Sequence, residues 1–210
     1  MIKKTKLAEY NTPLKADGII AINLKDGDEL VGVRHSTGAD DVLMVSRSGQ
    51  AIRFAEKDAR PMGRATAGVQ GMRLRKDDEV ISLHAAQDTD DLLVVTEQGY
   101  GKRTPVHEYP RKGRGGLGVK TVQLTDAKGK LAGSRIVRDG YQLMLISTGG
   151  TVIRMSVDEI KRLGRATQGV IVVRLREGEM VSSLAPVADS VADSDTVEDA
   201  PSDAAAPADV

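Results

Sequence analysis

Hydrophobic positions in this chain fall in short runs of four to seven residues, rich in Val, Ile and Leu, and glycine-containing turns separate the runs. This pattern is typical of successive antiparallel strands joined by tight turns. In the first complete unit it predicts strands near residues 19–24, 29–35, 42–46 and 50–54. Only SVDEIKRL, residues 156–163, favours a helical turn or two, after a serine cap. We therefore expect an all-β protein.

The chain repeats itself at offsets of 50 and 51 residues, which indicates an array of similar units. The first matching block is VLMVSRSGQAIRF (42–54), LLVVTEQGYGKRT (92–104) and LMLISTGGTVIRM (143–155). The second is MGRATAGVQGMRL (62–74), KGRGGLGVKTVQL (112–124) and LGRATQGVIVVRL (163–175), with a degenerate copy KADGIIAINL (15–24). Four strands in about 50 residues predict a blade of a β-propeller-like fold.

The repeats along the chain do not add up to a whole number of blades. Residues 2–4 align with residues 52–54, so the chain opens on the last strand of a blade, and the fourth unit stops after MVSSLAPV. We expect about three and a half four-stranded blades in an incomplete ring, with unpaired strand edges at both ends. Residues 1–185 are assigned to these blades. Residues 186–210, rich in Ala, Asp and Ser, are expected to form a disordered acidic tail.

Composition narrows the chemistry that the chain can support. Trp is absent and there are one Phe and four Tyr, so aliphatic side chains must form the core. The absence of Cys excludes disulfides, zinc–thiolate sites and a thiol nucleophile, and it favours a reducing compartment. No stretch approaches the roughly 18 apolar residues of a membrane span, and no signal peptide is recognisable. The expectation is a cytoplasmic protein with no membrane partner.

The formal net charge of zero hides an asymmetry. All 30 Lys and Arg lie at or before Arg176, whereas residues 186–210 hold 7 of the 30 acidic residues. Residues 1–185 therefore carry a formal charge of +7. A basic body suggests an anionic partner, although its 23 acidic residues also fit an ordinary mixed surface.

A Gly-Arg pair recurs once in each unit, and another glycine follows four residues after the arginine. The arginines are Arg64, Arg114 and Arg165, and the later glycines are Gly68, Gly118 and Gly169. One guanidinium per blade would make a periodic row able to contact phosphates, while ion pairing between blades is the alternative. The later glycines are expected to shape the connection between blades, because glycine tolerates a positive φ and close backbone approach.

The segment RKGRGGLG is the densest basic stretch, and its charges and glycines suit a phosphate chain gripped without base readout. It contributes Arg111, Lys112 and Arg114, with Lys120 beyond. The arginines in register at the hairpin ends, Arg53, Arg103 and Arg154, are further candidates for contact with phosphates. The sequence predicts neither catalytic residues nor a metal site, since its three His are not spaced as ligands and its acidic turns lack an EF-hand pattern.

In combination, the GRAT-x-GV block, the hairpins ending in IR or KR, the opening KKTKL-x-EY and the segment EYP-x-x-GRGG-x-G resemble one family. This is the C-terminal β-pinwheel of the DNA gyrase A protein, and the resemblance covers residues 2 to about 185. It implies part of a six-bladed wheel whose basic outer rim wraps DNA. The family's basic heptad, Q-R-R-G-G-K-G, has its nearest match in residues 112–118, which keep the central Arg-Gly-Gly and the last Gly.

The resemblance implies double-stranded DNA, the gyrase B protein and the rest of the gyrase A protein as partners in an ATP-dependent type IIA topoisomerase that introduces negative supercoils. It implies no catalytic residue and no cofactor in this part, since ATP and Mg²⁺ belong to other parts of the holoenzyme. One alternative is the corresponding domain of the topoisomerase IV A protein. Another is a propeller-type scaffold for protein interactions, suggested by Gly115-Gly116 and Gly149-Gly150, although kelch-like repeats depend on aromatic residues.

Overall fold

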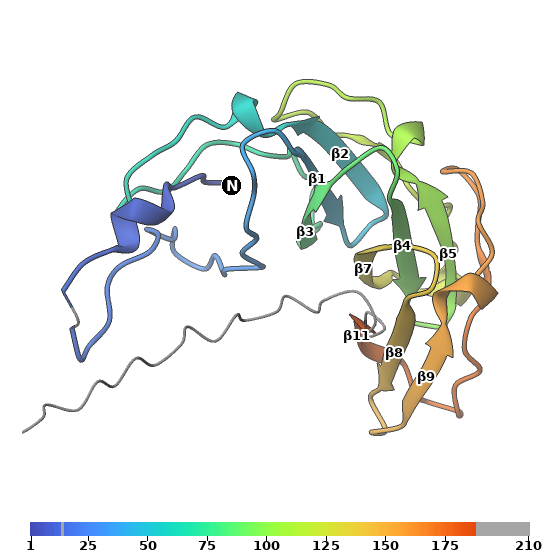
Figure 1. Ribbon diagram of the computed structural model, residues 1–210. Coiled ribbons are helices and arrows are strands. Elements are labelled where there is room, and N and C mark those ends of the chain that lie inside the picture. Colours follow the sequence, from blue (N-terminus) through green and yellow to red (C-terminus); the bar gives the residue numbers. More distant parts are fainter. Residues whose placement is uncertain (14, 188–210) are drawn as a thin grey trace, which may run out of the picture.

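Three antiparallel sheets follow one another along an open arc (Figure 1). The computed structural model describes residues 1–13 and 15–187, and most of the predicted acidic tail lies outside them. Within this part the regular elements are strands and single 3₁₀ turns, which confirms the all-β, propeller-like prediction.

The strands of the three sheets are as follows. The first sheet has the order β3-β1-β2-β6, with β1 (Asp41–Ser46), β2 (Gln50–Ala55), β3 (Val80–Ala86) and β6 (Val119–Lys120). The second has the order β10-β5-β4-β7, with β4 (Asp91–Thr96), β5 (Tyr100–Pro105), β7 (Leu131–Val137) and β10 (Val170–Ile171). The third has the order β11-β8-β9, with β8 (Gln142–Ser147), β9 (Val152–Ser156) and β11 (Val181–Val187).

The outermost strand of each four-stranded sheet comes from the following unit. β6 lies beyond the second hairpin in sequence but pairs with β2 of the first, with Ala51 opposite Val119. β10 pairs in the same way with β5, with Gly101 opposite Val170. The prediction that four consecutive strands form a blade is therefore wrong in detail. Consecutive units are tied together by backbone hydrogen bonds as well as by side-chain packing.

Residues 19–24 and 29–35 are not strands, which corrects the sequence prediction. Residues 29–35 precede β3 by 51 positions and so occupy the place of an inner strand. The described part of the chain has no hairpin beside them to supply the hydrogen bonds that a strand needs. Their apolar side chains consequently remain exposed, with Leu30 at 54% and Val33 at 68%.

The opening residues occupy the place predicted for a last strand, with a register shift of one. Ile2 bridges Val69 as Ala51 pairs with Val119, and Lys4 bridges Pro61 as Arg53 bridges Arg111. Ile2 is thus equivalent to Ala51, not to Ile52. The correction matters because it makes Lys3 equivalent to Ile52 and to Lys102.

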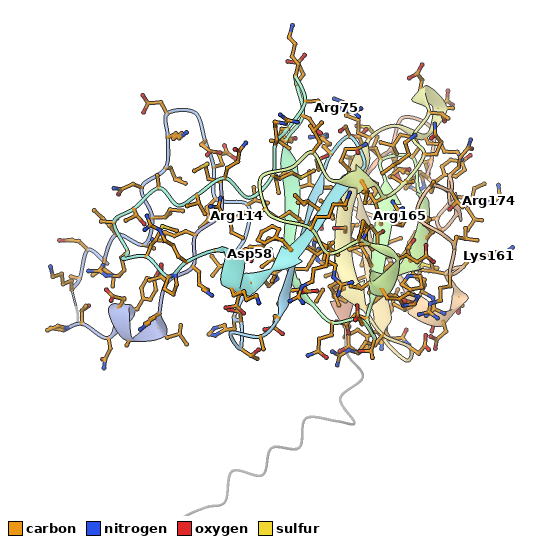
Figure 2. The ribbon with its side chains drawn as sticks, turned by 90° about the horizontal axis from the view of Figure 1, so that it is seen from above. Asp58, Arg75, Arg114, Lys161, Arg165 and Arg174 are labelled. Atoms are coloured by element: carbon orange, nitrogen blue, oxygen red, sulfur yellow. The ribbon has the colours of Figure 1, made fainter. Side chains whose placement is uncertain are left out.

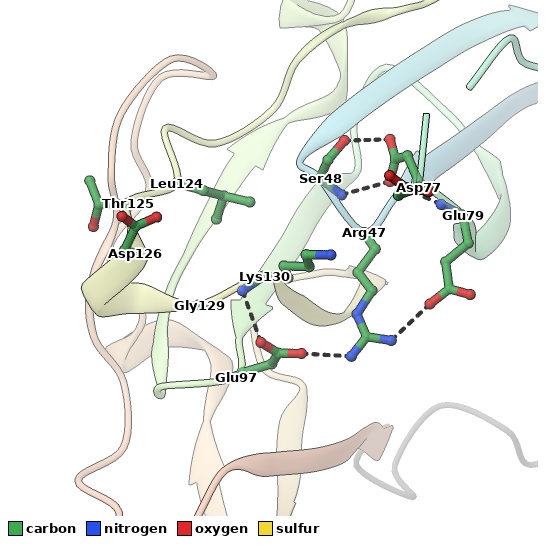
Figure 3. Close-up of a pocket in the computed structure, with 11 residues that line it drawn as sticks. Arg47, Ser48, Asp77, Glu79, Glu97, Leu124, Thr125, Asp126, Gly129 and Lys130 are labelled. Atoms are coloured by element: carbon green, nitrogen blue, oxygen red, sulfur yellow. Dashed lines mark hydrogen bonds and ion pairs between the residues drawn. The ribbon is translucent and has the colours of Figure 1, made fainter. Parts of the chain in front are cut away.

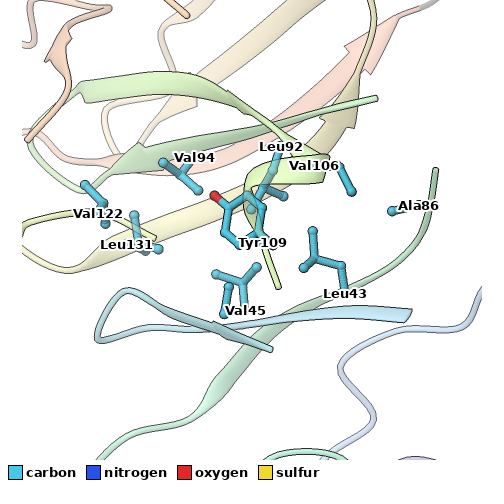
Figure 4. Close-up of a cluster of buried hydrophobic side chains, with 10 residues drawn as sticks. Leu43, Val45, Ala86, Leu92, Val94, Val106, Tyr109, Val122 and Leu131 are labelled. Atoms are coloured by element: carbon cyan, nitrogen blue, oxygen red, sulfur yellow. The ribbon is translucent and has the colours of Figure 1, made fainter. Parts of the chain in front are cut away.

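Aliphatic side chains fill the space between neighbouring sheets, as the composition predicts. Leu43 and Val45 of β1 pack with Leu92 and Val94 of β4, and Leu131 of β7 joins them (Figure 4). All six positions of β1 and of β4 are buried, because each central strand has other parts of the protein on both faces. Tyr109 is the one large aromatic side chain in this cluster, and its Oη lies 2.5 Å from Thr121 Oγ1.

Five 3₁₀ turns complete the described elements: η1 (Leu7–Tyr10), η2 (Glu56–Asp58), η3 (Val106–Glu108), η4 (Asp126–Lys128) and η5 (Val157–Glu159). The last is the helical turn predicted after a serine cap, and Ser156 Oγ accepts a hydrogen bond from the backbone N–H of Asp158 at 3.2 Å. β11 continues to Val187, two residues past the predicted domain boundary, and Val187 still pairs with Gln142.

Candidate nucleic-acid interface

Three connecting segments cover the outer side of the arc. We call them crossover 1 (residues 61–70), crossover 2 (111–120) and crossover 3 (162–171). Crossover 2 begins at a bridge between Arg111 and Arg53 and ends where Val119 pairs with Ala51, so it runs along the outer edge of β2. The other two run in the same way beside residues 2–4 and β5. Figure 1 shows β3, β7 and β11 on the concave side and crossovers 2 and 3 on the convex side.

Arg64, Arg114 and Arg165 lie at the same place on successive crossovers, as their spacing predicts. Each donates through Nη1 to a backbone oxygen of the preceding unit, on Ile20 (2.9 Å), Gln70 (2.9 Å) and Lys120 (3.1 Å). The acceptors are themselves 50 residues apart. The row therefore links neighbouring units through carbonyl oxygens, where ion pairing between blades was the alternative considered from sequence.

These hydrogen bonds leave part of each guanidinium available. Arg114 also donates through Nε to the Asp58 oxygen at 3.0 Å. Nε and Nη2 of Arg64 and Arg165 have no side-chain or backbone acceptor in the part of the chain that the structure describes. Arg114 is exposed, Arg64 and Arg165 are half-buried, and Figure 2 shows Arg114 and Arg165 from the same side of the molecule. An outside anion can therefore reach the row.

The later glycines allow the crossovers to touch the preceding sheet. Gly68, Gly118 and Gly169 have φ of 84°, 77° and 75°. A Cβ on Gly118 would lie 2.3 Å from the backbone oxygen of Ala51, and one on Gly169 would lie 2.7 Å from that of Gly101. Both the positive φ and the close approach exclude a side chain here.

The other candidates of crossover 2 differ in their surroundings. Arg111 Nη2 lies 2.8 Å from Oδ1 of the buried Asp41. Lys120 donates from Nζ to Gln123 Oε1 at 2.6 Å. Lys112 is exposed, and its ammonium has no partner among the described residues. All three stand on the outer edge, and Lys112 is the cation least occupied by the protein.

Arg53 and Arg103 point into the protein. Arg53 is 7% exposed and forms ion pairs of 2.6 Å with Asp41 and with Asp88. Arg103 donates to the Ile160 oxygen at 2.9 Å and pairs with Asp139. These contacts give both arginines a structural role, and we leave them out of the proposed interface. Arg154, the third member, is exposed on β9 and also takes part in an interaction within the chain.

Several exposed cations on or beside the crossovers are missing from the sequence-based set. They repeat in pairs: Arg60 with Lys161, Arg73 with Arg174, and Arg75 with Arg176. Figure 2 shows Arg75, Lys161 and Arg174 at the margin of the molecule. None of these six side chains has an acceptor among the residues that the structure describes. The block alignment contains the signal, since MRLR and VRLR occupy equivalent places.

An open groove of about 950 Å³ separates the hairpin turns of the first two sheets (Figure 3). Arg47 spans it, with Nη1 2.8 Å from Glu79 and Nη2 2.6 Å from Glu97. The hydrogen bond from Arg47 holds the pKa of Glu97 below its usual value. Carboxylates outnumber cations along this groove, so it does not suit a phosphate.

Neither a metal centre nor a membrane span stands out in residues 1–13 and 15–187. No group of three or more His, Asp or Glu side chains there is placed to hold a metal ion. No helix in the same range has the length and apolar character that crossing a membrane requires.

A family model described as "DNA gyrase C-terminal domain, beta-propeller" matches the chain in four successive segments, residues 1–36, 40–87, 90–138 and 141–188. The chain belongs to this family. The resemblance inferred from its motifs is thereby confirmed. Each matched segment of this gyrase C-terminal domain corresponds to one repeat, and the last three contain the hairpins β1–β2, β4–β5 and β8–β9.

Curated relatives agree with this membership. The DNA gyrase A protein of Salmonella typhimurium is 44% identical over 192 residues, which are 91% of this chain and 22% of that protein. The DNA gyrase A protein of Mycobacterium tuberculosis is 43% identical over 200 residues, 94% of this chain and 24% of that protein. The chain thus spans about a quarter or less of the length of these relatives.

Solved structures show the same fold. The C-terminal domain of DNA topoisomerase IV superposes with a TM-score of 0.83 at 26% identity, covering 90% of this chain and 59% of that one. The DNA gyrase A C-terminal domain superposes with a TM-score of 0.74 at 25% identity, covering 81% and 58%. Both kinds of domain therefore share the arc of sheets.

Proposed function

We propose that this chain binds double-stranded DNA through its phosphates along the outer edge formed by crossovers 1 to 3. It would do so as a non-catalytic part of a protein like gyrase A, acting with the remainder of that protein and with the gyrase B protein. In that setting the bound DNA would be wrapped to favour ATP-dependent negative supercoiling. ATP and Mg²⁺ would be held elsewhere in the holoenzyme.

The observation that carries this proposal is the recurrence of exposed cations along one edge at a fixed interval. Each crossover supplies an arginine with free donors. Crossovers 1 and 3 have further cations on the segments that lead into and out of them, and crossover 2 itself carries Arg111, Lys112 and Lys120. A curved row of positive charge follows a bent phosphate backbone without any need to read bases. The crossovers carry no Phe, Tyr or Trp that would stack on an unpaired base.

A salt titration tests phosphate binding directly. Affinity for a duplex, measured by fluorescence anisotropy, should fall steeply with salt, with a log–log slope of about −0.9 for each phosphate neutralised. Two duplexes of unrelated sequence should bind alike. A flat salt response, or a strong preference for one duplex, would contradict the proposal.

Wrapping requires a separate measurement. A nicked circular DNA is sealed by ligase in the presence and absence of the protein, and the linking-number distributions are compared. A shift that grows with protein concentration indicates wrapping of one hand. Binding without a shift would mean that this chain grips DNA but does not wrap it by itself.

The second candidate is the corresponding part of topoisomerase IV, favoured by the superposition on that enzyme's solved domain. Residues 112–118 also depart from the gyrase heptad at three of seven positions. The two candidates differ at the level of the whole enzyme. Replacing the equivalent region of a gyrase A protein by this chain should preserve negative supercoiling in the first case and abolish it in the second.

A further inference from the structure

A lysine ammonium lies beneath crossover 3 and binds the backbone of its Gly-Arg pair. Lys102 of β5 is 0% exposed, and its Nζ donates to the oxygens of Gly164 at 2.5 Å and Arg165 at 2.6 Å. Two further contacts from the same strand hold the start of this crossover. Thr104 Oγ1 donates to the Leu163 oxygen at 2.8 Å, and Arg103 Nε donates to the Ile160 oxygen.

The same contact recurs under crossover 1. Lys3 occupies the position of Lys102, and its Nζ donates to the oxygens of Gly63 and Arg64. In both crossovers a threonine donates to the same glycine oxygen, from Thr66 Oγ1 to Gly63 and from Thr167 Oγ1 to Gly164, each at 2.9 Å. In both crossovers the glycine oxygen therefore accepts one hydrogen bond from a lysine and one from a threonine.

Crossover 2 lacks both groups. Ile52 stands in place of the lysine and Gly116 in place of the threonine, and Ile52 Cδ1 lies 3.6 Å from where a Cβ of Gly116 would be. This crossover is tied instead to its neighbour, by Gly115 N to the Gly71 oxygen at 2.6 Å and by Arg73 N to the Gly116 oxygen at 2.8 Å. Ile52 shows that the fold does not require an ammonium here.

Burying a lysine without a direct ion pair is costly, which argues that Lys102 is kept for something other than stability. Burial lowers the pKa of Lys102 to about 8, Glu108 opposes the shift, and Arg165 adds to it. Glu108 is linked to the same crossover, because its Oε2 accepts from the Arg165 backbone N–H at 3.2 Å. Lys102 and Glu108 therefore both bind the backbone of Arg165, one at its oxygen and the other at its N–H.

We propose that Lys102 is a positioning residue for DNA binding: it holds Gly164 and Arg165 in the conformation that presents the Arg165 guanidinium to a phosphate. Lys3 does the same for Arg64. Crossover 2 has no such lysine, and its Gly-Arg segment is held by the preceding unit instead. This inference rests on the proposed function, because it assigns Arg165 to phosphate binding. A preset arginine loses less conformational entropy when it binds.

We call the contact of the Lys102 ammonium with the Gly164 and Arg165 oxygens the clamp. Limited digestion with trypsin tests it without DNA. In the wild-type chain, cleavage after Arg165 should be slow, because Lys102 holds the Gly164 and Arg165 oxygens. Cleavage after Arg114, where Gly115 N is held by the Gly71 oxygen, serves as the internal reference. Lys102→Met should accelerate cleavage after Arg165 and leave cleavage after Arg114 unchanged. Thr167→Val, at an exposed position, removes the second donor to the Gly164 oxygen and leaves Lys102 in place. It should accelerate cleavage after Arg165 less than Lys102→Met does. Equal rates after Arg165 in all three proteins would overturn the clamp, whatever happens with DNA.

A double-mutant cycle tests the link to DNA. Lys102→Met and Arg165→Gln should each weaken duplex affinity about three- to tenfold, and the double variant should be no weaker than Arg165→Gln alone, because Lys102 acts through Arg165. Lys130→Met, at the acidic groove, reports the effect of losing one distant charge. Effects that multiply in the double variant would overturn the positioning role. Absence of duplex binding by the wild type would refute the proposed function. The trypsin experiment would still test whether Lys102 holds the backbone of Gly164 and Arg165, because it does not use DNA.

Discussion

Arg165 donates through Nη1 to the backbone oxygen of Lys120, at 3.1 Å, and so joins crossover 3 to crossover 2. Arg114 and Arg64 make the equivalent bond one and two units earlier. A guanidinium has five donors in a planar fork, so one can be used inside the protein while others face outward. The two roles considered from the sequence, linking blades and meeting phosphates, are compatible in this geometry.

Changing Arg64, Arg114 and Arg165 together to Gln should therefore affect both properties. The changes at Arg64 and Arg165 each remove one hydrogen bond to a carbonyl, and the change at Arg114 removes two. Each lost bond costs about 0.5–1.5 kcal/mol in the free energy of unfolding, and three charges leave the edge in total. Duplex affinity at low salt should fall and the salt slope should become shallower. Urea unfolding and fluorescence anisotropy measure the two effects.

The triple Lys variant is the matched control. Lys keeps the charge but not the planar fork, so most of the salt slope should remain while unfolding still becomes easier. Unchanged affinity in the triple Gln variant would remove the arginine row from the DNA interface.

Gly118→Val should be among the most destabilising single changes in the chain. The new side chain would need a φ of 77° and would meet the Ala51 oxygen, so we expect a loss on the order of 3 kcal/mol or failure to fold. Gly113→Ala, five residues earlier in the same crossover, is the control, because a Cβ there has nothing within 4 Å. Thermal unfolding followed by circular dichroism compares the two. Similar midpoints for both variants would contradict the close approach.

Stability should decrease at mildly acidic pH partly through one histidine. Burial, with Arg34 and Arg135 nearby, lowers the pKa of His84 to about 3 from 6.5. Below pH 6.5 His84 becomes protonated in the unfolded chain but stays neutral in the folded chain. Its contribution to the free energy of unfolding is therefore full above pH 6.5 and is lost as the pH falls towards 3. The slope is on the order of 1.4 kcal/mol per pH unit.

Urea unfolding between about pH 7 and 4 measures this slope, and His84→Leu should flatten it. Ser134, which lies 3.1 Å from His84 Nε2, keeps Ser82 as a partner in the variant. The same substitution at exposed His107 should leave the slope as in the wild type. An unchanged slope in His84→Leu would mean that this histidine does not carry the acid sensitivity.

The acidic residues after β11 should compete with DNA for the basic edge. Residues 186–210 hold seven carboxylates, formally equal to the +7 of residues 1–185. A variant ending at Val187 should bind a duplex more tightly than the full chain at low salt. The difference should shrink near about 0.2 M salt, where the Debye length falls below about 8 Å. Equal affinities at low salt would exclude competition.

The sequence alone determined the fold class, the repeat and the family. Strand-length apolar runs, glycine turns and the 50-residue offset depend only on local chemistry and spacing, and they correctly placed the hairpins β1–β2, β4–β5 and β8–β9. The same alignment put Arg64, Arg114 and Arg165 at equivalent positions and contained Arg73 and Arg174, which were not singled out. Local pattern is sufficient for these features because the residues that define them lie close together in the chain.

Only the tertiary structure decided which strand lies beside which and which arginines are free. Val119 pairs with Ala51 across 68 residues. Residues 29–35 are rich in apolar side chains, yet they remain irregular because no strand lies beside them in the described part of the chain. Arg53 and Arg114 look alike in sequence, yet one is buried against Asp41 and the other stands on the outer edge. Strand pairing and burial depend on contacts between residues far apart in the chain, which local spacing does not encode.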